Sequence, residues 1–282
     1  MYTLPNLTKP APDTQQHTAW SQADLCDALE IRRALLHGQF RAYLQPQFDL
    51  SSGAVDALEV LARWQHPELG LLTPATFIPA LAHKHLLDDL LHALLDQGLA
   101  CQIELYRDGH KSPVAFNLSL PQLANASSVE RLIARLREHP LPLSWITLEI
   151  TEDGPAVLSD FCVQNAMRLR QLGVRLSLDD YGTGQSSLLR LCQLPFDEIK
   201  LAGELIRQLL KSPRQCSIVR TTVNLAKELG LRLVVEGIET EDQRRCLAQL
   251  GVGVGQGYLR AQPMSVDALR RWLALRGNDF AA

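Results

Sequence analysis

Two adjacent aspartates, Asp179 and Asp180, stand where an apolar alternating segment ends and a glycine turn begins, in the stretch RLSLDDYGTG. Neighbouring like charges repel each other, and one aspartate is sufficient to cap the N–H groups of a turn. Two carboxylates at a strand end can, however, ligate a pair of metal ions about 3.5–4 Å apart, with one carboxylate bridging both. The pair therefore indicates a two-metal site, with a turn cap as the structural alternative.

Polar side chains occupy corresponding places in the other apolar segments, within each segment or at its end. In chain order these residues are Gln45, Glu59, Asn117, Glu149, Asp179 with Asp180, Lys200, Glu236 and Gln256. Several should point inward, and an unpaired buried charge costs several kcal/mol unless its pKa shifts or it gains a partner or a metal. Carboxylates directed at one cavity would repel strongly, and a divalent cation would hold them together. Oxygen ligands without histidine or cysteine favour Mg²⁺ or Mn²⁺ over Zn²⁺.

The elements that would position these residues are short apolar segments that alternate with helical patterns. The predicted strands are 41–50, 55–64, 113–120, 145–151, 174–180, 196–201, 232–237 and 253–259. The clearest helical patterns are 21–38, 120–139, 156–173, 203–230, 240–251 and 265–277. This alternation favours an α/β fold with a mainly parallel sheet, and eight strands fit a closed (β/α)8 TIM-like barrel. The short connection 51–53 predicts a hairpin, so one strand near the N-terminus would be antiparallel.

Length and composition restrict the class of protein. The chain has 282 residues, 46% of them hydrophobic, and a formal net charge of −3. It can bury a substantial core and has no general attraction for nucleic acid polymers or anionic lipid. We expect a disordered extension at 1–20, one domain at 21–276 and a tail at 277–282. Because no apolar run approaches the roughly 20 residues that cross a bilayer, and no secretory signal pattern opens the chain, we expect a cytoplasmic protein without a membrane span.

Taken together, the motifs resemble those of the EAL family of bacterial cyclic di-GMP phosphodiesterases. EVLAR at 59–63 is similar to the motif that names the family, with Val60 in its middle position. The other matching motifs are QPQFDL (45–50), RWQHPELGLLTPATFIP (63–79), NLS (117–119), EITE (149–152), DDYGTGQSSL (179–188), LPFDEIKL (194–201), VVEGIETEDQ (234–243) and GQGY (255–258). No single tetrapeptide is specific, but nine motifs in family order are. The resemblance covers about residues 22–275 and implies that the domain at 21–276 is an EAL phosphodiesterase domain.

The resemblance implies a role for each polar residue. The metal ligands would be Glu59, Asn117, Glu149, Asp179, Asp180 and Glu236. The residues that handle water, protons and charge would be Lys200, Glu236, Asp180 and Gln256. Substrate contacts would come from Gln45, Arg63, Leu61, Asp180 and Gly184. Glu152 would brace the loop after Asp180, and Glu239 would support the site. Each role also has a structural alternative, such as an outward glutamate, a solvent-exposed arginine or a carboxylate at a helix terminus.

The function that the resemblance implies is hydrolysis of cyclic di-GMP to linear pGpG. Two Mg²⁺ or Mn²⁺ ions per active site would lower the pKa of a bound water for in-line attack on phosphorus. The resemblance also implies a homodimer and inhibition by Ca²⁺, whose longer bonds and greater number of ligands suit this geometry poorly.

One departure from the family and two rival functions stay open. Ala202 stands two residues after Lys200, where the family usually has aspartate, and this change could loosen the surroundings of the metal site. Catalytically weak or inactive relatives act as cyclic di-GMP receptors or interaction modules, and an assay for the hydrolysis product would separate them from enzymes. A barrel glycosidase using two of the carboxylates would remain active in a chelator, but it explains neither the aspartate pair nor Lys200.

Overall fold

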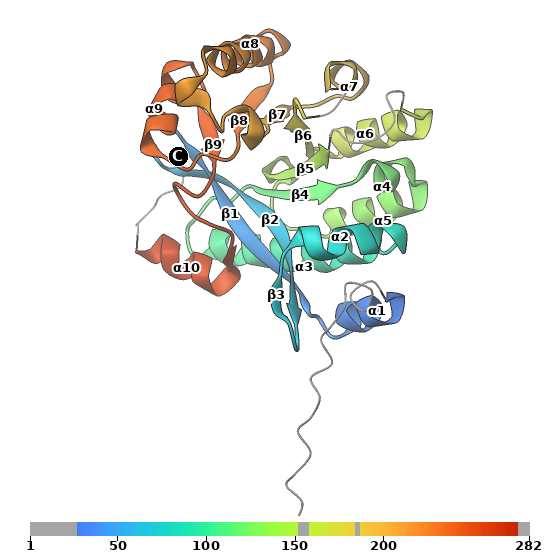
Figure 1. Cartoon of the computed structure of the whole chain (residues 1–282). Coiled ribbons are helices and arrows are strands. Elements are labelled where there is room, and N and C mark those ends of the chain that lie inside the picture. Colours follow the sequence, from blue (N-terminus) through green and yellow to red (C-terminus); the bar gives the residue numbers. More distant parts are fainter. Residues whose placement is uncertain (1–26, 152–157, 184–186, 276–282) are drawn as a thin grey trace, which may run out of the picture.

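The computed structural model describes residues 27–151, 158–183 and 187–275, and its strands close into a barrel (Figure 1). The barrel strands are β1 (Phe40–Asp49), β2 (Val55–His66), β4 (Val114–Leu118), β5 (Ile146–Thr151), β6 (Arg175–Tyr181), β7 (Glu198–Leu201), β8 (Arg232–Val235) and β9 (Val254–Gln256). Neighbours from β2 through β4 to β9 are parallel, and β1 closes the barrel by pairing antiparallel with both β9 and β2. The predicted (β/α)8 barrel with one antiparallel strand is therefore confirmed. Two short strands, β3 (Gly70–Leu72) and β10 (Met264–Ser265), pair antiparallel with β2 and β1.

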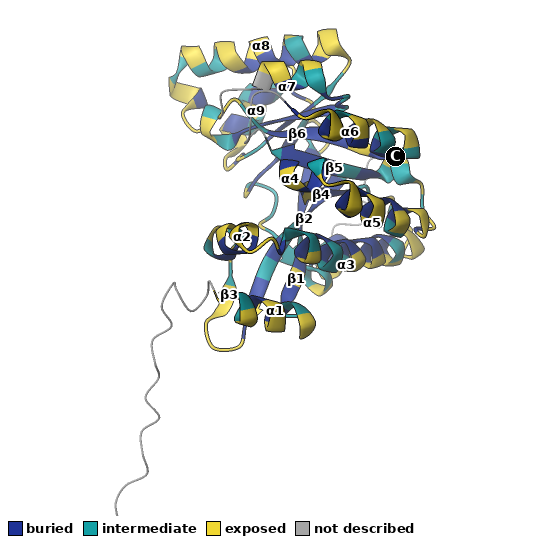
Figure 2. Ribbon diagram, turned by 90° about the vertical axis from the view of Figure 1, so that its right-hand side faces the viewer, coloured by how far each residue is buried: buried dark blue, intermediate teal, exposed yellow. Residues whose placement is uncertain are grey.

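Helices surround the barrel and turn their buried faces toward the strands (Figure 2). They are α1 (Ala28–Leu36), α2 (Pro74–His83), α3 (Leu87–Arg107), α4 (Leu120–Ala124), α5 (Ala126–Arg137), α6 (Asp160–Leu172), α7 (Ser187–Gln193), α8 (Pro213–Leu229), α9 (Glu241–Gln249) and α10 (Val266–Ala274). Such one-sided burial follows from apolar residues recurring at helical spacing. Within the described ranges, no helix combines the length and the apolar character needed to cross a membrane.

Two of the predicted helices are interrupted. The stretch 120–139 forms α4 and α5, because Asn125 adopts an extended backbone and its side chain accepts hydrogen bonds from the N–H groups of Ser127 and Ser128. The stretch 203–230 forms two 3₁₀ turns before α8, which begins at Pro213 after the capping residue Ser212. Proline lacks an N–H group and is tolerated in the first turn of a helix but not in its interior.

The predicted hairpin joins β1 to β2 and sets the register of the first polar side chains. The Asp49 carboxylate accepts hydrogen bonds from the backbone N–H groups of Ser51 and Ser52, and these bonds shape the turn. In the resulting register Gln45 lies opposite Glu59. The predicted ends of the domain, after residue 20 and after residue 276, both lie outside the described residues.

Glycines allow the segments that follow β7, β8 and β9 to pack closely. A Cβ atom on Gly257 would lie 2.1 Å from the backbone oxygen of Ile238, so only glycine fits there. Gly237 has a φ of +70°, and a Cβ on it would lie 2.9 Å from the Cα of Gly203. These contacts hold the chain next to Glu236 and Gln256 in place.

Candidate metal and catalytic site

Lys200 lies at the centre of a group of carboxylates inside the barrel. Its side chain is 1% exposed, and its Nζ lies 2.7 Å from Glu236 Oε1 and 2.9 Å from Glu149 Oε2. The same ammonium group lies 3.1 Å from Asp179 Oδ1 and 3.5 Å from Glu59 Oε2. The four carboxylates come from β2, β5, β6 and the residue directly after β8. They converge toward the C-terminal ends of the parallel strands, where barrels of this kind carry their active sites.

Asp179 and Asp180 reach this site together because β6 contains a bulge. Adjacent residues of a regular strand point to opposite faces of the sheet. Here Leu178 pairs with Ile199 and Tyr181 pairs with Leu201, so β6 has one extra residue relative to β7. Asp180 has a φ of 54°, in the left-handed region that few residues other than glycine adopt.

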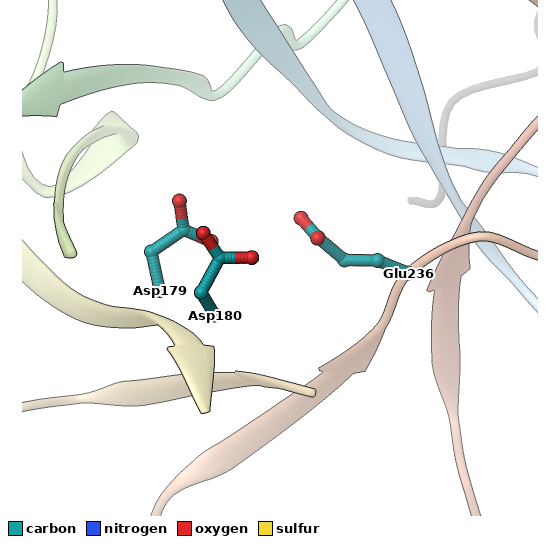
Figure 3. A group of neighbouring side chains, drawn as sticks. All are labelled: Asp179, Asp180 and Glu236. Atoms are coloured by element: carbon teal, nitrogen blue, oxygen red, sulfur yellow. The ribbon is translucent and has the colours of Figure 1, made fainter. Parts of the chain in front are cut away.

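The bulge places the two aspartates side by side, facing Glu236 across the site (Figure 3). One oxygen from each of Asp179, Asp180 and Glu236 lies within 4.8 Å of the others. A backbone conformation of this kind is uncommon and tends to occur at functional sites. The two neighbouring aspartates therefore direct their carboxylates at the same part of the site, opposite Glu236.

Amide side chains hold Glu59. Asn117 Nδ2 donates to Glu59 Oε1 at 3.2 Å, and Gln256 Nε2 donates to Glu59 Oε2 at 2.6 Å. Gln256 Nε2 also donates to Gln45 Oε1 at 3.1 Å, while Gln45 Nε2 donates to the backbone oxygen of Ala261 at 3.1 Å. Gln45, predicted to contact substrate, is 7% exposed. In this structure its amide supports Gln256, and its contact with substrate stays a prediction.

The electrostatics of the site keep Lys200 charged and Glu59 ionised. Burial acts to lower the pKa of Lys200, but the attraction of the surrounding carboxylates, Asp179 foremost, raises it well above its usual range. Burial acts to raise the pKa of Glu59, yet Lys200 and the amide of Gln256 outweigh it, so the net direction is downward.

Two other carboxyl groups hold their protons more tightly. Burial, together with repulsion from Glu59, raises the pKa of Glu149 well above its usual range. Burial also raises the pKa of Glu236 to about 8, with Asp179 adding to the effect and Lys200 opposing it. Without a further cation, these groups bind protons at pH values where a carboxyl group in water is ionised.

The arrangement fits divalent metal ions. Four carboxyl groups surround one ammonium group and Asp180 adds a fifth nearby, so the site has many more acidic groups than its own cation can balance when they are ionised. Among the described residues, the buried Oε1 of Gln256 accepts no hydrogen bond. All the atoms available as metal ligands here are oxygen atoms, which Mg²⁺ and Mn²⁺ prefer. The residues present are therefore able to hold such ions.

Arg63 and Leu61 continue from Glu59 along β2. The Arg63 guanidinium lies 5.7 Å from the centroid of the Tyr43 ring, and its NH1 donates to the backbone oxygen of Ala62 at 2.7 Å. Leu61 lies with Asn117 on the wall of a largely apolar cavity of about 570 Å³ between β2, β4, α2 and α3. Both residues lie beyond Glu59 on β2, and their substrate contacts stay predictions.

Other predicted site residues are placed elsewhere or not described. Glu152 and Gly184 lie outside the described residues. Glu239 is exposed, and its backbone N–H donates to Gln243 Oε1 at 2.9 Å at the start of α9. The backbone of Glu239 thus takes part in capping α9, and its support of the site remains a prediction.

Gln47 contacts the site but was not among the residues predicted from the sequence. Gln47 Nε2 donates to Glu149 Oε1 at 3.5 Å. The signal was present, because residues two apart on a strand share a face and Gln47 follows Gln45 by two.

Comparison with known proteins identifies the family. The sequence model described as "EAL domain" matches residues 28–263. This chain belongs to the EAL domain family. The EAL resemblance predicted from the motifs is thereby confirmed.

Relatives and solved structures extend this match. This EAL chain is 41% identical over 242 residues to the cyclic di-GMP phosphodiesterase RocR of Pseudomonas aeruginosa, covering 86% of the chain and 62% of RocR. It is 36% identical over 249 residues to MucR of the same organism, a bifunctional diguanylate cyclase/cyclic di-GMP phosphodiesterase, covering 87% of the chain and 35% of MucR. The chain thus spans less than two thirds of either relative. A solved structure of the PaMucR phosphodiesterase in complex with c-di-GMP matches with a TM-score of 0.79 and 35% identity, covering 86% of this chain and 98% of that one.

Proposed function

We propose that this EAL domain hydrolyses cyclic di-GMP to linear pGpG in a reaction that depends on divalent metal ions. The observation that carries the proposal is the convergence of carboxylates around Lys200 at the catalytic end of the barrel. Relatives named as cyclic di-GMP phosphodiesterases, and a structural neighbour that holds c-di-GMP, support this substrate.

Two Mg²⁺ or Mn²⁺ ions per active site are the proposed cofactors, and Ca²⁺ is expected to inhibit. The ligands would be Glu59, Asn117, Glu149, Asp179, Asp180 and Glu236. When bound, such ions polarise phosphoryl oxygens and lower the pKa of water. The large excess of carboxylates over the single ammonium group supports more than one cation.

The chain's own residues supply orientation, charge and proton handling. Lys200 remains positively charged and is placed to stabilise negative charge that develops on the phosphate. Glu236, whose side chain is partly exposed and lies 2.7 Å from Lys200 Nζ, is placed to take part in proton transfer with the attacking water. Arg63, on the same strand as Glu59, is placed to hold a substrate phosphate through its guanidinium group. Gln256 and Asn117 fix the orientation of Glu59.

The test is turnover of cyclic di-GMP, with the products separated by chromatography. We expect linear pGpG with Mg²⁺, and none with EDTA or in Glu59→Ala. The control is Glu138→Ala, which removes an exposed glutamate on the outer surface. Tight binding without product would support the receptor alternative. Product formation in EDTA would contradict the metal-dependent mechanism.

We further propose that the chain acts as a homodimer in the cytoplasm. Leu188 and Leu189 are exposed apolar side chains on α7, the helix that follows β6 and its aspartate pair. Burial of such residues between two copies would remove apolar surface from water. Sedimentation of the chain and of Leu188→Asp tests this, since the variant should sediment as a monomer.

A further inference from the structure

A second group of polar side chains lies inside the barrel, toward the N-terminal ends of the parallel strands. We call it the lower cluster, and its members are Gln47, Asp56, Glu198 and Arg232. Glu198 and Arg232 are the first residues of β7 and β8, and Asp56 is the second residue of β2. This cluster takes no part in the proposed chemistry, yet one of its members contacts a predicted metal ligand.

The contacts of the lower cluster form a continuous chain to the site. Arg232 forms an ion pair with Asp56, and its Nε lies 3.4 Å from Glu198 Oε2. Arg232 NH2 donates to Gln47 Oε1 at 3.4 Å, and Gln47 Nε2 donates to Glu149 Oε1 at 3.5 Å. Gln47 is 1% exposed, whereas the side chains of Arg232 and Asp56 are 26% and 27% exposed. This series of contacts therefore extends from solvent at the lower end of the barrel to the carboxyl groups around Lys200.

The chemistry of these groups fixes the direction of the Gln47 amide. A guanidinium group only donates hydrogen bonds, so the amide must turn its oxygen toward Arg232. In this orientation the NH₂ group faces Glu149 and donates to Oε1, while Lys200 contacts Oε2. The fully buried Glu149 carboxyl group thus has Gln47 at one oxygen and the ammonium group of Lys200 2.9 Å from the other.

The antiparallel strand explains how one segment serves two carboxylates. Gln45 and Gln47 share a face of β1 and lie opposite Glu59 and Gln256 in the register. Gln45 supports Gln256, which holds Glu59, while Gln47 reaches across to Glu149.

We infer that Gln47 is a positioning residue for the metal ligand Glu149, and that Arg232 sets the orientation in which Gln47 acts. This inference rests on the proposed metal-dependent function. Residues that orient a metal ligand affect metal affinity without touching the metal.

The experiment measures Mn²⁺ binding to the chain without substrate, by electron paramagnetic resonance and calorimetry, together with kcat, KM and Tm. Gln47→Met keeps the side-chain length and removes the amide. We expect its Kd for Mn²⁺ to rise about 10-fold, with KM for cyclic di-GMP unchanged at saturating metal.

The matched control is Gln102→Met. Gln102 is equally buried, but its amide NH₂ donates to the backbone oxygens of Ser112 and Trp145, away from the site. It should lower Tm and leave the Kd for Mn²⁺ unchanged. An equal loss of Tm in both variants, with unchanged Mn²⁺ binding in Gln47→Met, would show that Gln47 is only structural and overturn the inference.

A second variant keeps the test decisive where Gln47→Met folds poorly. Arg232→Met leaves the Gln47 amide in place but removes the group that directs it, so Mn²⁺ binding should weaken by a smaller factor. Arg232→Lys retains a donor and should restore part of the affinity, and equal Kd values for both variants would contradict the role of Arg232. If the unchanged chain binds Mn²⁺ and turns over substrate, but the variants bind Mn²⁺ equally well, only the positioning role of Gln47 is rejected. Absence of Mn²⁺ binding by the unchanged chain would overturn both proposals.

Discussion

The barrel interior holds one polar cluster at each end, and the two differ in charge balance. In the candidate site, four carboxyl groups surround the ammonium group of Lys200, and Asp180 adds a fifth nearby. In the lower cluster, Asp56 and Glu198 face Arg232, and Gln47 adds a neutral amide. Within the described ranges, the one group of acidic side chains in reach of a common metal ion is Asp179, Asp180 and Glu236.

This difference separates a binding site from a supporting network. A guanidinium group presents its donors in a rigid plane and satisfies a few acceptors well, whereas an ammonium group is a compact charge that several carboxylates can approach. Buried polar side chains occur in both clusters, since Gln47 and Glu198 are buried as Lys200 is, so burial alone does not mark the site. The marker is an excess of negative charge that the chain's own cations leave uncompensated.

The largest effect should follow from removing the central cation, which would test this comparison directly. Lys200→Met leaves buried carboxylates without their partner, and breaking a buried ion pair costs about 3–5 kcal/mol. We expect loss of turnover and a large drop in Tm in EDTA, with part of the Tm restored by Mg²⁺, because the metal supplies positive charge at the same place. Differential scanning fluorimetry with and without Mg²⁺ measures this. Lys227→Met, which removes an exposed lysine of α8, serves as the control. If Mg²⁺ did not raise the Tm of Lys200→Met, the excess of acidic groups would not be what the metal compensates.

The second effect concerns the bulge that turns the aspartate pair into one site. Asn tolerates the left-handed backbone nearly as well as Asp, so Asp180→Asn removes the charge and keeps the conformation. We expect turnover to fall by about 100-fold or more, beyond the effect of supporting residues, with little change in Tm. His85 has a similar φ of 55° and is an exposed residue between α2 and α3, so His85→Asn is a matched control with normal turnover. Full activity in Asp180→Asn would mean that the Asp180 carboxylate is not needed for turnover and that the bulge has only a structural role.

The third prediction is a pH dependence of stability. The folded chain holds a proton on Glu236 up to a pKa of about 8, whereas the unfolded chain releases it near the ordinary glutamate pKa of 4.5. The folded state then binds more protons between these values, so stability should fall as pH rises from about 4.5 to 8. Glu149, whose pKa is also raised, acts in the same direction. Because Mg²⁺ competes with these protons, its increase of Tm should be greater at the upper end of this window than at the lower end. Thermal melts across the window in EDTA and in Mg²⁺ measure the difference, and Glu236→Gln should flatten the EDTA curve.

Much of the fold, and the convergence of most candidate site residues, could be predicted from the sequence for physical reasons. Strand alternation is a local signal, and the barrel rule then brings residues as distant as Glu59 and Glu236 to one end. The bulge could not be predicted, because the φ of Asp180 depends on how β6 pairs with β7. The break at Asn125 was missed because the apolar pattern continues across it. Gln47 was missed although its spacing of two from Gln45 indicates the same face of the strand, because its reach to Glu149 depends on how the barrel closes.

The smallest effect should come from the outer end of the lower cluster. Asp56→Asn removes one partner of Arg232 at a partly exposed position, and the guanidinium retains its contacts with Glu198 and Gln47. Pairs open to solvent contribute at most about 1 kcal/mol, which corresponds to a Tm change of about 2–4 °C in a chain of this size. Mn²⁺ binding should stay unchanged, because the direction of the Gln47 amide depends on Arg232 and not on Asp56. A calorimetric Kd that rises as much in Asp56→Asn as in Arg232→Met would mean that the whole lower cluster belongs to the metal site, and that charge balance does not separate the two ends of the barrel.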